Sequence, residues 1–244
     1  MTKVSRDLGL LVLLTLLSLG APSYATSFTV VLDSGTTQRT TALVASDVAT
    51  GQDMTGMSVT AFFTGGSLQT AIWNAPGSPQ AGGAFGTNWQ LVQSGNTQSP
   101  LGPWTLQNST TLSIERLLID AGSGNVVFDT SFSGLDGTNL SGAGFSFLPL
   151  LNPGLDILAT YRDTVALADS APVGDTFRFL DVAFTNPGKF ATGNTLVFIA
   201  DTDLLAIPGD IAPVPEPGTF VLLTTALVTM LGYRWQCRKL DKQS

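Results

Sequence analysis

The residues of this chain best placed to bind a ligand are two aspartates near its C-terminal end, Asp201 and Asp203. They follow an apolar run that is typical of a β-strand, and because they are two residues apart, their side chains lie on the same face of an extended backbone. Carboxylates are the hard oxygen ligands that Ca²⁺ prefers. The oxygen-rich turns 120–125 and 136–139 offer similar donors, but none of these segments matches a calcium-binding loop, and turns require Asp and Asn in any case. The sequence therefore predicts no cofactor, with calcium at Asp201 and Asp203 as the one candidate.

The chain contains no histidine. This absence excludes Ser-His-Asp and Cys-His catalysis and the usual histidine-based zinc and iron sites. The single cysteine, Cys237, lies in the C-terminal segment, so the rest of the chain has no thiol nucleophile and no disulfide. Glu115 stands beside Arg116 in a predicted strand, which is typical of an ordinary surface residue. A hydrolase that uses two Asp carboxylates is the catalytic alternative that this composition leaves open.

Three tryptophans, Trp73, Trp89 and Trp104, bracket or interrupt the segment 74–103, which is rich in glycine and proline. This segment predicts long loops around one short strand, and long loops in a compact domain are often functional. If the indoles are exposed on one surface, their flat apolar faces can stack on sugar rings. The alternative is that the three indoles fill the ends of the core, and because no pattern indicates their exposure, this alternative is favoured.

Short strands are the elements that must position these residues. Alternating or fully apolar runs are separated by Gly, Pro, Asn, Asp and Ser at intervals of roughly ten to fifteen residues, and no long amphipathic helix interrupts them. The pattern predicts an all-β domain in which two antiparallel sheets pack as a sandwich, with a jelly-roll-like topology favoured. The predicted strands are 27–32, 41–45, 57–63, 67–73, 88–93, 104–107, 112–120, 126–129, 157–167, 176–184 and 195–200.

The body of the chain, residues 26–213, is strongly acidic. It carries five basic residues against fourteen Asp and one Glu, which gives a net charge of −10. This charge repels nucleic acid and anionic lipid, so we expect no nucleic-acid partner. Because the body has only one Lys and one Glu, its polar surface consists mostly of Ser, Thr, Asn, Gln and Gly, a composition that suits an extracellular scaffold or a neighbour of polysaccharide.

The N-terminal segment predicts a cleaved signal peptide, residues 1–25. Lys3 and Arg6 form a positive region, an apolar stretch of secretory length follows, and Ser23 and Ala25 flank a cleavage site of the small-x-small type. The mature chain then begins at Thr26 and includes a sandwich ectodomain over residues 26–209.

The C-terminal segment begins with a proline-rich spacer, residues 210–217, which ends in the motif Val214-Pro215-Glu216-Pro217. The uncharged run after Glu216 is long enough for a helix of roughly 25 Å, at the short end of the range that crosses a membrane. We therefore predict a transmembrane helix over residues 218–234.

Basic residues end the predicted helix and follow it, namely Arg234 at its last position and then Arg238 and Lys239. Because basic residues concentrate on the cytoplasmic side of a membrane, this end predicts a cytoplasmic tail over residues 235–244 and a body on the outer side.

The Val214–Pro217 motif, the membrane-length run and the basic end together resemble the PEP-CTERM sorting signal of Gram-negative bacteria. The resemblance implies that a membrane-embedded exosortase recognises and cuts the tail, and that the body then goes to the cell surface or the extracellular matrix. A permanent C-terminal membrane anchor is the alternative interpretation. The resemblance is confined to the tail and implies nothing about the chemistry of the body.

These observations favour a non-enzymatic, exported surface or extracellular-matrix protein that is first held in the inner membrane. Its partners are then the membrane, an exosortase-like processing enzyme and, in one alternative, extracellular polysaccharide bound through Trp73, Trp89 and Trp104. The remaining alternative is a glycoside hydrolase with paired Asp residues in a cleft.

Overall fold

The computed structural model describes residues 27–41, 43–75, 77, 80–97, 102–130, 144–168, 171–186 and 189–211. The predicted signal peptide, the Val214–Pro217 motif, the predicted transmembrane helix and the basic tail lie outside these residues. Within them, no helix has the length and apolar character needed to cross a membrane.

The described residues form strands almost throughout, as the spacing of apolar runs predicted. The only helical element among them is a single 3₁₀ turn, η1 (Gly122–Gly124). The strands are β1 (Phe28–Asp33), β2 (Gln38–Thr40), β3 (Leu43–Val48), β4 (Ser58–Phe63), β5 (Leu68–Ile72), β6 (Ala81–Gly86), β7 (Trp89–Ser94), β8 (Trp104–Asn108), β9 (Ile114–Asp120), β10 (Val126–Asp129), β11 (Leu148–Leu151), β12 (Asp156–Leu167), β13 (Thr176–Asn186), β14 (Thr195–Ile199) and β15 (Asp201–Leu205).

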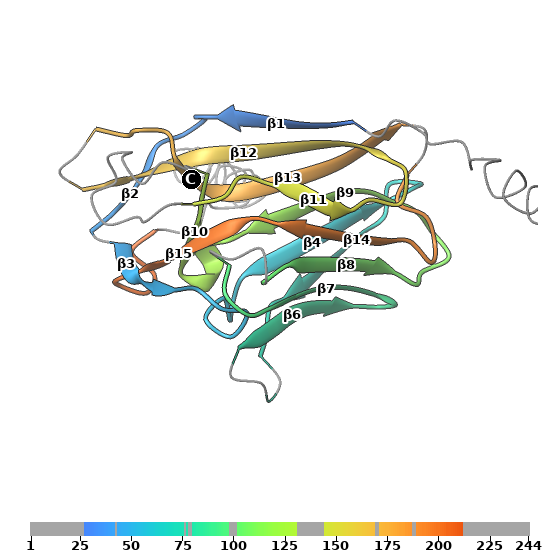
Figure 1. The fold of residues 1–244 in the computed structure, drawn as a ribbon, viewed down its shortest axis with the longest axis horizontal. Helices are drawn as coiled ribbons and strands as arrows, with labels where there is room; N and C mark the ends of the chain where they lie inside the picture. The colour runs from blue at the N-terminus through green and yellow to red at the C-terminus, as the bar shows by residue number, and fades with distance from the viewer. Residues whose placement is uncertain are drawn as a thin grey trace, which may run out of the picture.

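The strands make two sheets, which confirms the all-β prediction at this level. The larger sheet has ten strands, in the order β3-β15-β10-β13-β9-β4-β5, with β12 beside β13 and with β1 and β2 beside β12. The smaller sheet has five strands in the order β11-β14-β8-β7-β6. In Figure 1 the long strands of both sheets lie along roughly the same horizontal axis, from β1 and β12 at the top to β7 and β6 near the bottom.

The larger sheet is not wholly antiparallel, and this corrects the prediction of two antiparallel sheets. β1 pairs with β12 in parallel, from Phe28 beside Ile157 to Asp33 beside Arg162. β2 also pairs with β12 in parallel. Parallel neighbours need a long connection, and here residues 41–155 separate β2 from β12. The alternation of apolar residues along a strand does not indicate which distant strand it pairs with. The parallel direction of these pairs could therefore not be predicted from the sequence.

One hydrophobic core joins the two sheets. Leu117 and Leu180 of the larger sheet and Leu106 and Phe198 of the smaller sheet belong to the same buried cluster. A second, smaller cluster contains Leu43, Val127, Val165, Leu205 and Ile211. Leu43 of β3 and Ile211 at the end of the last described segment therefore pack together on the larger sheet, with Val127 of β10 and Leu205 of β15.

Strand β6 lies inside the segment that was predicted as loops, so that prediction is wrong for residues 81–86. β6 pairs with β7 as an antiparallel hairpin, from Ala81 beside Ser94 to Gly86 beside Trp89. The strand could not be recognised from the sequence because glycine, which is normally unfavourable in strands, occupies three of its positions. Here they are required by close contacts: a Cβ on Gly82 would lie 2.0 Å from the carbonyl oxygen of Gly51, and one on Gly86 would lie 1.9 Å from Trp89 Nε1.

The chain crosses from one sheet to the other at Ala200. β14 ends at Ile199 in the smaller sheet, and β15 begins at Asp201 in the larger sheet. The indole N–H of Trp104 donates to the carbonyl of Ala200 at 2.9 Å, which fixes this corner. Asp201 and Asp203 therefore lie within a strand of their own rather than at the end of the preceding one.

Candidate functional site

Three aspartates meet beside this corner. Asp129 ends β10, and Asp201 and Asp203 belong to β15. The antiparallel register places Asp129 directly opposite Asp201, so both side chains project from the same face of the sheet, and the alternation along β15 puts Asp203 on that face as well. One carboxylate oxygen from each residue lies within 4.8 Å of the others. We call these three residues the aspartate cluster.

The aspartate cluster is shielded from water. The relative accessible surface is 0% for Asp129 and Asp201 and 1% for Asp203. Burial, followed by the negative charges of Asp203 and Asp129, raises the pKa of Asp201 to about 8, whereas the Thr97 hydroxyl and the Thr202 amide lower it to a smaller extent. Three ionised carboxylates in so small a dry volume repel one another strongly, so at neutral pH the cluster holds a proton or a cation.

No hydrogen bond of normal geometry from the described residues reaches either carboxylate oxygen of Asp201. The nearby Thr97 hydroxyl lies instead within hydrogen-bond distance of two carbonyl oxygens, at 3.0 Å from Ala49 and 3.2 Å from Thr202. A buried carboxylate without such bonds is costly unless another group compensates its charge. Asp201 is therefore the residue of the cluster that most requires an explanation.

The chain around residue 145 holds the aspartate cluster in place. The backbone N–H of Asp201 donates to the carbonyl of Phe145 at 3.0 Å. Gly144 lies against Asp129 so closely that a Cβ would stand 2.3 Å from the carboxylate carbon. Glycine is the residue that permits this contact, which limits the positions open to the Asp129 carboxylate.

Tyr161 lies near the aspartate cluster but is not a base. Its hydroxyl oxygen accepts a hydrogen bond from the Phe147 N–H at 2.7 Å. Burial raises the pKa of Tyr161 far above its usual value, and the charges of Asp201 and Asp129 raise it further. The phenol therefore stays protonated over the whole physiological range.

The aspartate cluster can hold a hard cation or share a proton, but it does not form the catalytic pair of the hydrolase alternative. That alternative requires two carboxylates in a cleft that a glycan can enter. All three cluster residues are almost completely inaccessible, so a polymer cannot reach them.

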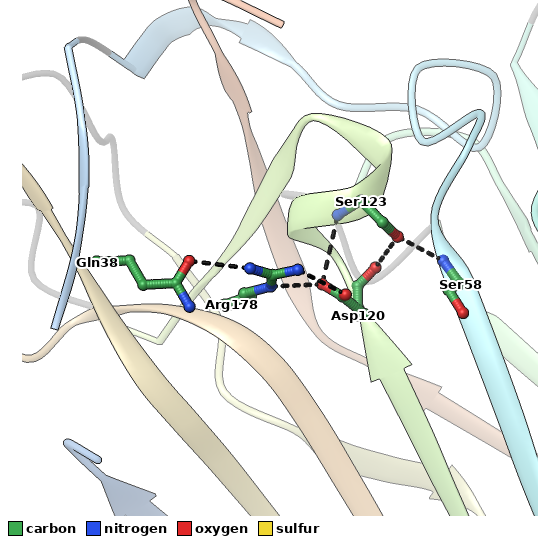
Figure 2. A network of polar contacts seen from close by, with 5 residues as sticks. All are labelled: Gln38, Ser58, Asp120, Ser123 and Arg178. Atoms are coloured by element: carbon green, nitrogen blue, oxygen red, sulfur yellow. Dashed lines mark hydrogen bonds and ion pairs between the residues drawn. The ribbon is translucent and has the colours of Figure 1, made fainter. Parts of the chain in front are cut away.

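Arg178 is a buried charge that the sequence analysis did not single out. Its guanidinium binds Asp120 through two hydrogen bonds of 2.8 Å each and donates to Gln38 at 3.0 Å (Figure 2). Ser123 donates from its backbone to the same carboxylate at 3.3 Å and accepts a hydrogen bond from the Ser58 N–H at 2.8 Å. This network links β2, β4, β9 and β13 around a 2% exposed arginine, so its role is structural.

The three tryptophans are buried, so they do not form the exposed row of indoles that stacking on sugar rings requires. Trp73 and Trp104 have no accessible surface, and Trp89 has 3%. Trp73 and Trp104 contact each other with their ring centroids 5.3 Å apart, and Trp73 Nε1 donates to the Gly51 carbonyl at 2.7 Å. The indoles thus fill the core, which was the favoured alternative, and each N–H donates to a carbonyl or amide oxygen inside it.

A small surface pocket lies over the β6–β7 turn and the end of β8. Its volume is about 290 Å³, at the lower limit for small-molecule sites. Phe85 is 44% exposed at its edge, and Gln90 donates to Gln107 at 2.7 Å inside it. The pocket is lined by Phe85, Gly86, Asn88, Trp89, Gln90, Gln107 and Ser109.

Asp201 and Asp203 of the aspartate cluster were predicted as ligands from the sequence, whereas Asp129 was not. Asp129 is the last residue of the predicted strand 126–129, and Asp201 directly follows the predicted strand 195–200. An acidic residue at the end of an apolar run was therefore a signal that both residues share. Only the β10–β15 register shows that the two meet.

Comparisons with models of known protein families, with curated proteins and with solved structures found no match to this chain. The resemblance of residues 214–239 to a PEP-CTERM signal therefore remains a prediction from the sequence.

Proposed function

We propose that this chain is the precursor of a non-enzymatic surface or extracellular-matrix protein, exported through its signal peptide and sorted through a PEP-CTERM tail. The observation that carries the proposal is the combination of two terminal signals on either side of a cysteine-free, β-rich body. In this account the body is a jelly-roll-like sandwich, the tail is a transmembrane helix with a cytoplasmic basic end, and an exosortase-like enzyme separates the two.

The packing of the body supports this account. Among the described residues, both hydrophobic clusters are built between Val30 and Ile211. The main cluster contains large aromatic side chains from both sheets, including Trp104, Phe128 and Phe198. A body that closes its own core can persist after its ends are removed, and it needs no disulfide to do so.

Cell fractionation of motif variants tests the sorting step. Pro215→Ala combined with Glu216→Ala should leave the chain in the inner membrane with its tail attached. Pro213→Ala is the matched control, because it changes the same spacer outside the motif, and it should reach the surface like the wild type. Equal surface delivery of both variants would contradict the proposal.

Polysaccharide binding is the second candidate function, and the pocket beside Phe85 is the observation that favours it. One exposed aromatic ring next to two amide side chains is a combination that recognises a sugar, because the ring stacks on its apolar face and amides bond to its hydroxyls. Phe85→Ala should abolish glycan binding, whereas Leu68→Ala, which removes an exposed apolar side chain outside the pocket lining, should not. Binding that survives in Phe85→Ala would exclude this pocket.

A further inference from the structure

The aspartate cluster is preformed by backbone pairing. Asp129 and Asp201 are held opposite each other by the β10–β15 ladder, and Asp203 lies one alternation further along the same strand. The corner at Ala200 is tied by Trp104, and Gly144 lies against the Asp129 carboxylate. The three carboxylates are therefore brought together by the fold itself rather than by flexible surface side chains.

Asp201 provides an independent indication that a cation belongs in this cluster. It is fully buried, neither of its oxygens receives a hydrogen bond of normal geometry from the described residues, and none of their ion pairs involves it. Folded proteins rarely leave a buried carboxylate in this state. Its carboxylate lies close to the two other acidic side chains, where a positive charge would satisfy all three.

The spacing of the oxygens suits a cation. Ca²⁺ lies about 2.3 to 2.6 Å from each oxygen ligand, so two ligands of one ion are at most about 5 Å apart. The cluster oxygens lie within 4.8 Å of one another, which satisfies this limit. Three ionised carboxylates carry more negative charge than one divalent ion neutralises. Because Ca²⁺ takes six to eight oxygen ligands, the three carboxylates also leave positions for further oxygen ligands.

The donor set selects the type of ion. All three side chains are carboxylates, and the chain has no histidine, so softer metals that prefer nitrogen or sulfur have no suitable partner here. Mg²⁺ requires a nearly ideal octahedron and retains its water, which fits poorly in a site closed to solvent, whereas Ca²⁺ accepts irregular shells.

We propose that Asp129, Asp201 and Asp203 bind one Ca²⁺ ion that ties β10 to β15 at the corner where the chain passes between the two sheets. The affinity expected for a site of this kind outside the cell is a Kd of about 10⁻⁴ to 10⁻³ M. The ion is structural, because the site is closed to larger ligands.

The test uses the full chain in detergent, freed of metal and titrated with CaCl₂, MgCl₂ or TbCl₃. At ten times its Kd, Ca²⁺ should raise Tm by about 3 to 6 °C. Tb³⁺ should show luminescence on excitation of tryptophan, since Trp104 bonds the residue that precedes Asp201, and Ca²⁺ should displace it.

Asp201→Asn is the informative variant, because it keeps the shape of the side chain and removes one charge. Without metal it should be at least as stable as the wild type, since it relieves repulsion, and its affinity for Ca²⁺ should fall about tenfold or more. Asp53→Asn is the matched control, because Asp53 is exposed and its carboxylate accepts hydrogen bonds from Thr50 within its own turn, and it should retain the full response.

Two results would overturn the proposal. The first is no change in Tm and no sensitised Tb³⁺ signal up to about 10 mM Ca²⁺, a concentration at or above ten times the Kd expected for such sites. In that case the three carboxylates share a proton instead. The second is an equal response to Ca²⁺ in Asp201→Asn and Asp53→Asn, which would place the ion elsewhere. A larger shift with Mg²⁺ than with Ca²⁺ would overturn the choice of calcium.

Discussion

Asp129 faces Asp201 across the β10–β15 ladder, although the two residues lie far apart in the sequence and belong to separate apolar runs. Directly opposed like charges destabilise a sheet, and burial increases the cost. The fold nevertheless places them there and adds Asp203 to the pair. The stability of this corner should therefore depend on what neutralises the three carboxylates.

The first prediction concerns pH. In metal-free buffer, the free energy of unfolding should fall as pH rises from about 4 to about 8. Burial and the charges of Asp203 and Asp129 raise the pKa of Asp201 to about 8, so across this window the folded state binds a proton that the unfolded state has released. The described titratable groups that act on Asp201 are Asp203 on its own strand, Asp129 on β10 and, from β12, Tyr161, which stays protonated.

Denaturant unfolding at several pH values measures this slope. The loss should reach a few kcal/mol at most (about 1.4 kcal/mol per unit of pKa shift is the upper limit), and Asp201→Asn should flatten the curve. A wild-type stability that rises steadily from pH 4 to 8 without metal would contradict the electrostatic description of the cluster.

The second prediction concerns the buried ion pair of Arg178. Arg178→Met keeps the apolar stem but leaves Asp120 without its two charged hydrogen bonds, so it should cost about 3 kcal/mol of unfolding free energy. Lys189→Met removes an exposed pair with Glu115 and should cost less than about 1 kcal/mol. Equal costs in chemical denaturation would show that burial does not strengthen the Arg178 pair.

The all-β class and most strands could be predicted from the sequence, because burial on one or both faces leaves a visible pattern of apolar residues. Runs such as 58–63 and 104–108 alternate between buried and half-buried positions, and both were predicted almost to their ends. Strands β2 and β11 were missed because β2 has only three residues and β11 is largely exposed, so burial imposes little pattern on either.

Strands β6 and β15 were missed for another reason. Each contains residues that normally disfavour strands, namely the glycines of β6 and the two aspartates of β15. Tertiary contacts explain why these residues occupy strands. Gly82 lets Gly51 and Trp73 pack closely against β6, and Asp201 pairs across the sheet with Asp129 of a distant strand. The local sequence pattern cannot predict either contact, because both join separate segments of the sequence.

The third prediction tests the requirement for glycine in β6. A Cβ on Gly82 would lie 2.0 Å from the Gly51 oxygen and 2.3 Å from Trp73 Nε1, so Gly82→Ala must displace backbone or break the indole hydrogen bond. It should cost about 3 kcal/mol, the upper part of the range for overpacking. Near-ultraviolet circular dichroism would also report the disturbed tryptophan environment.

Gly66→Ala is the matched control for that variant. A Cβ on Gly66 would meet no atom within 4 Å, but the residue has a φ of +85°, so its substitution should cost only about 1 kcal/mol of backbone strain. If Gly82→Ala is no more harmful than Gly66→Ala, the close approach of β6 to Gly51 does not limit the fold.

The central claim, export with processing at both ends, is tested most directly by the intact mass of the protein recovered from the culture supernatant and from the membranes of its own host. If both ends are processed, the surface or released form should begin at Thr26 and end near Pro217. A membrane-bound species that still carries residues 234–244 as the sole mature form would contradict it and would identify the tail as a permanent anchor.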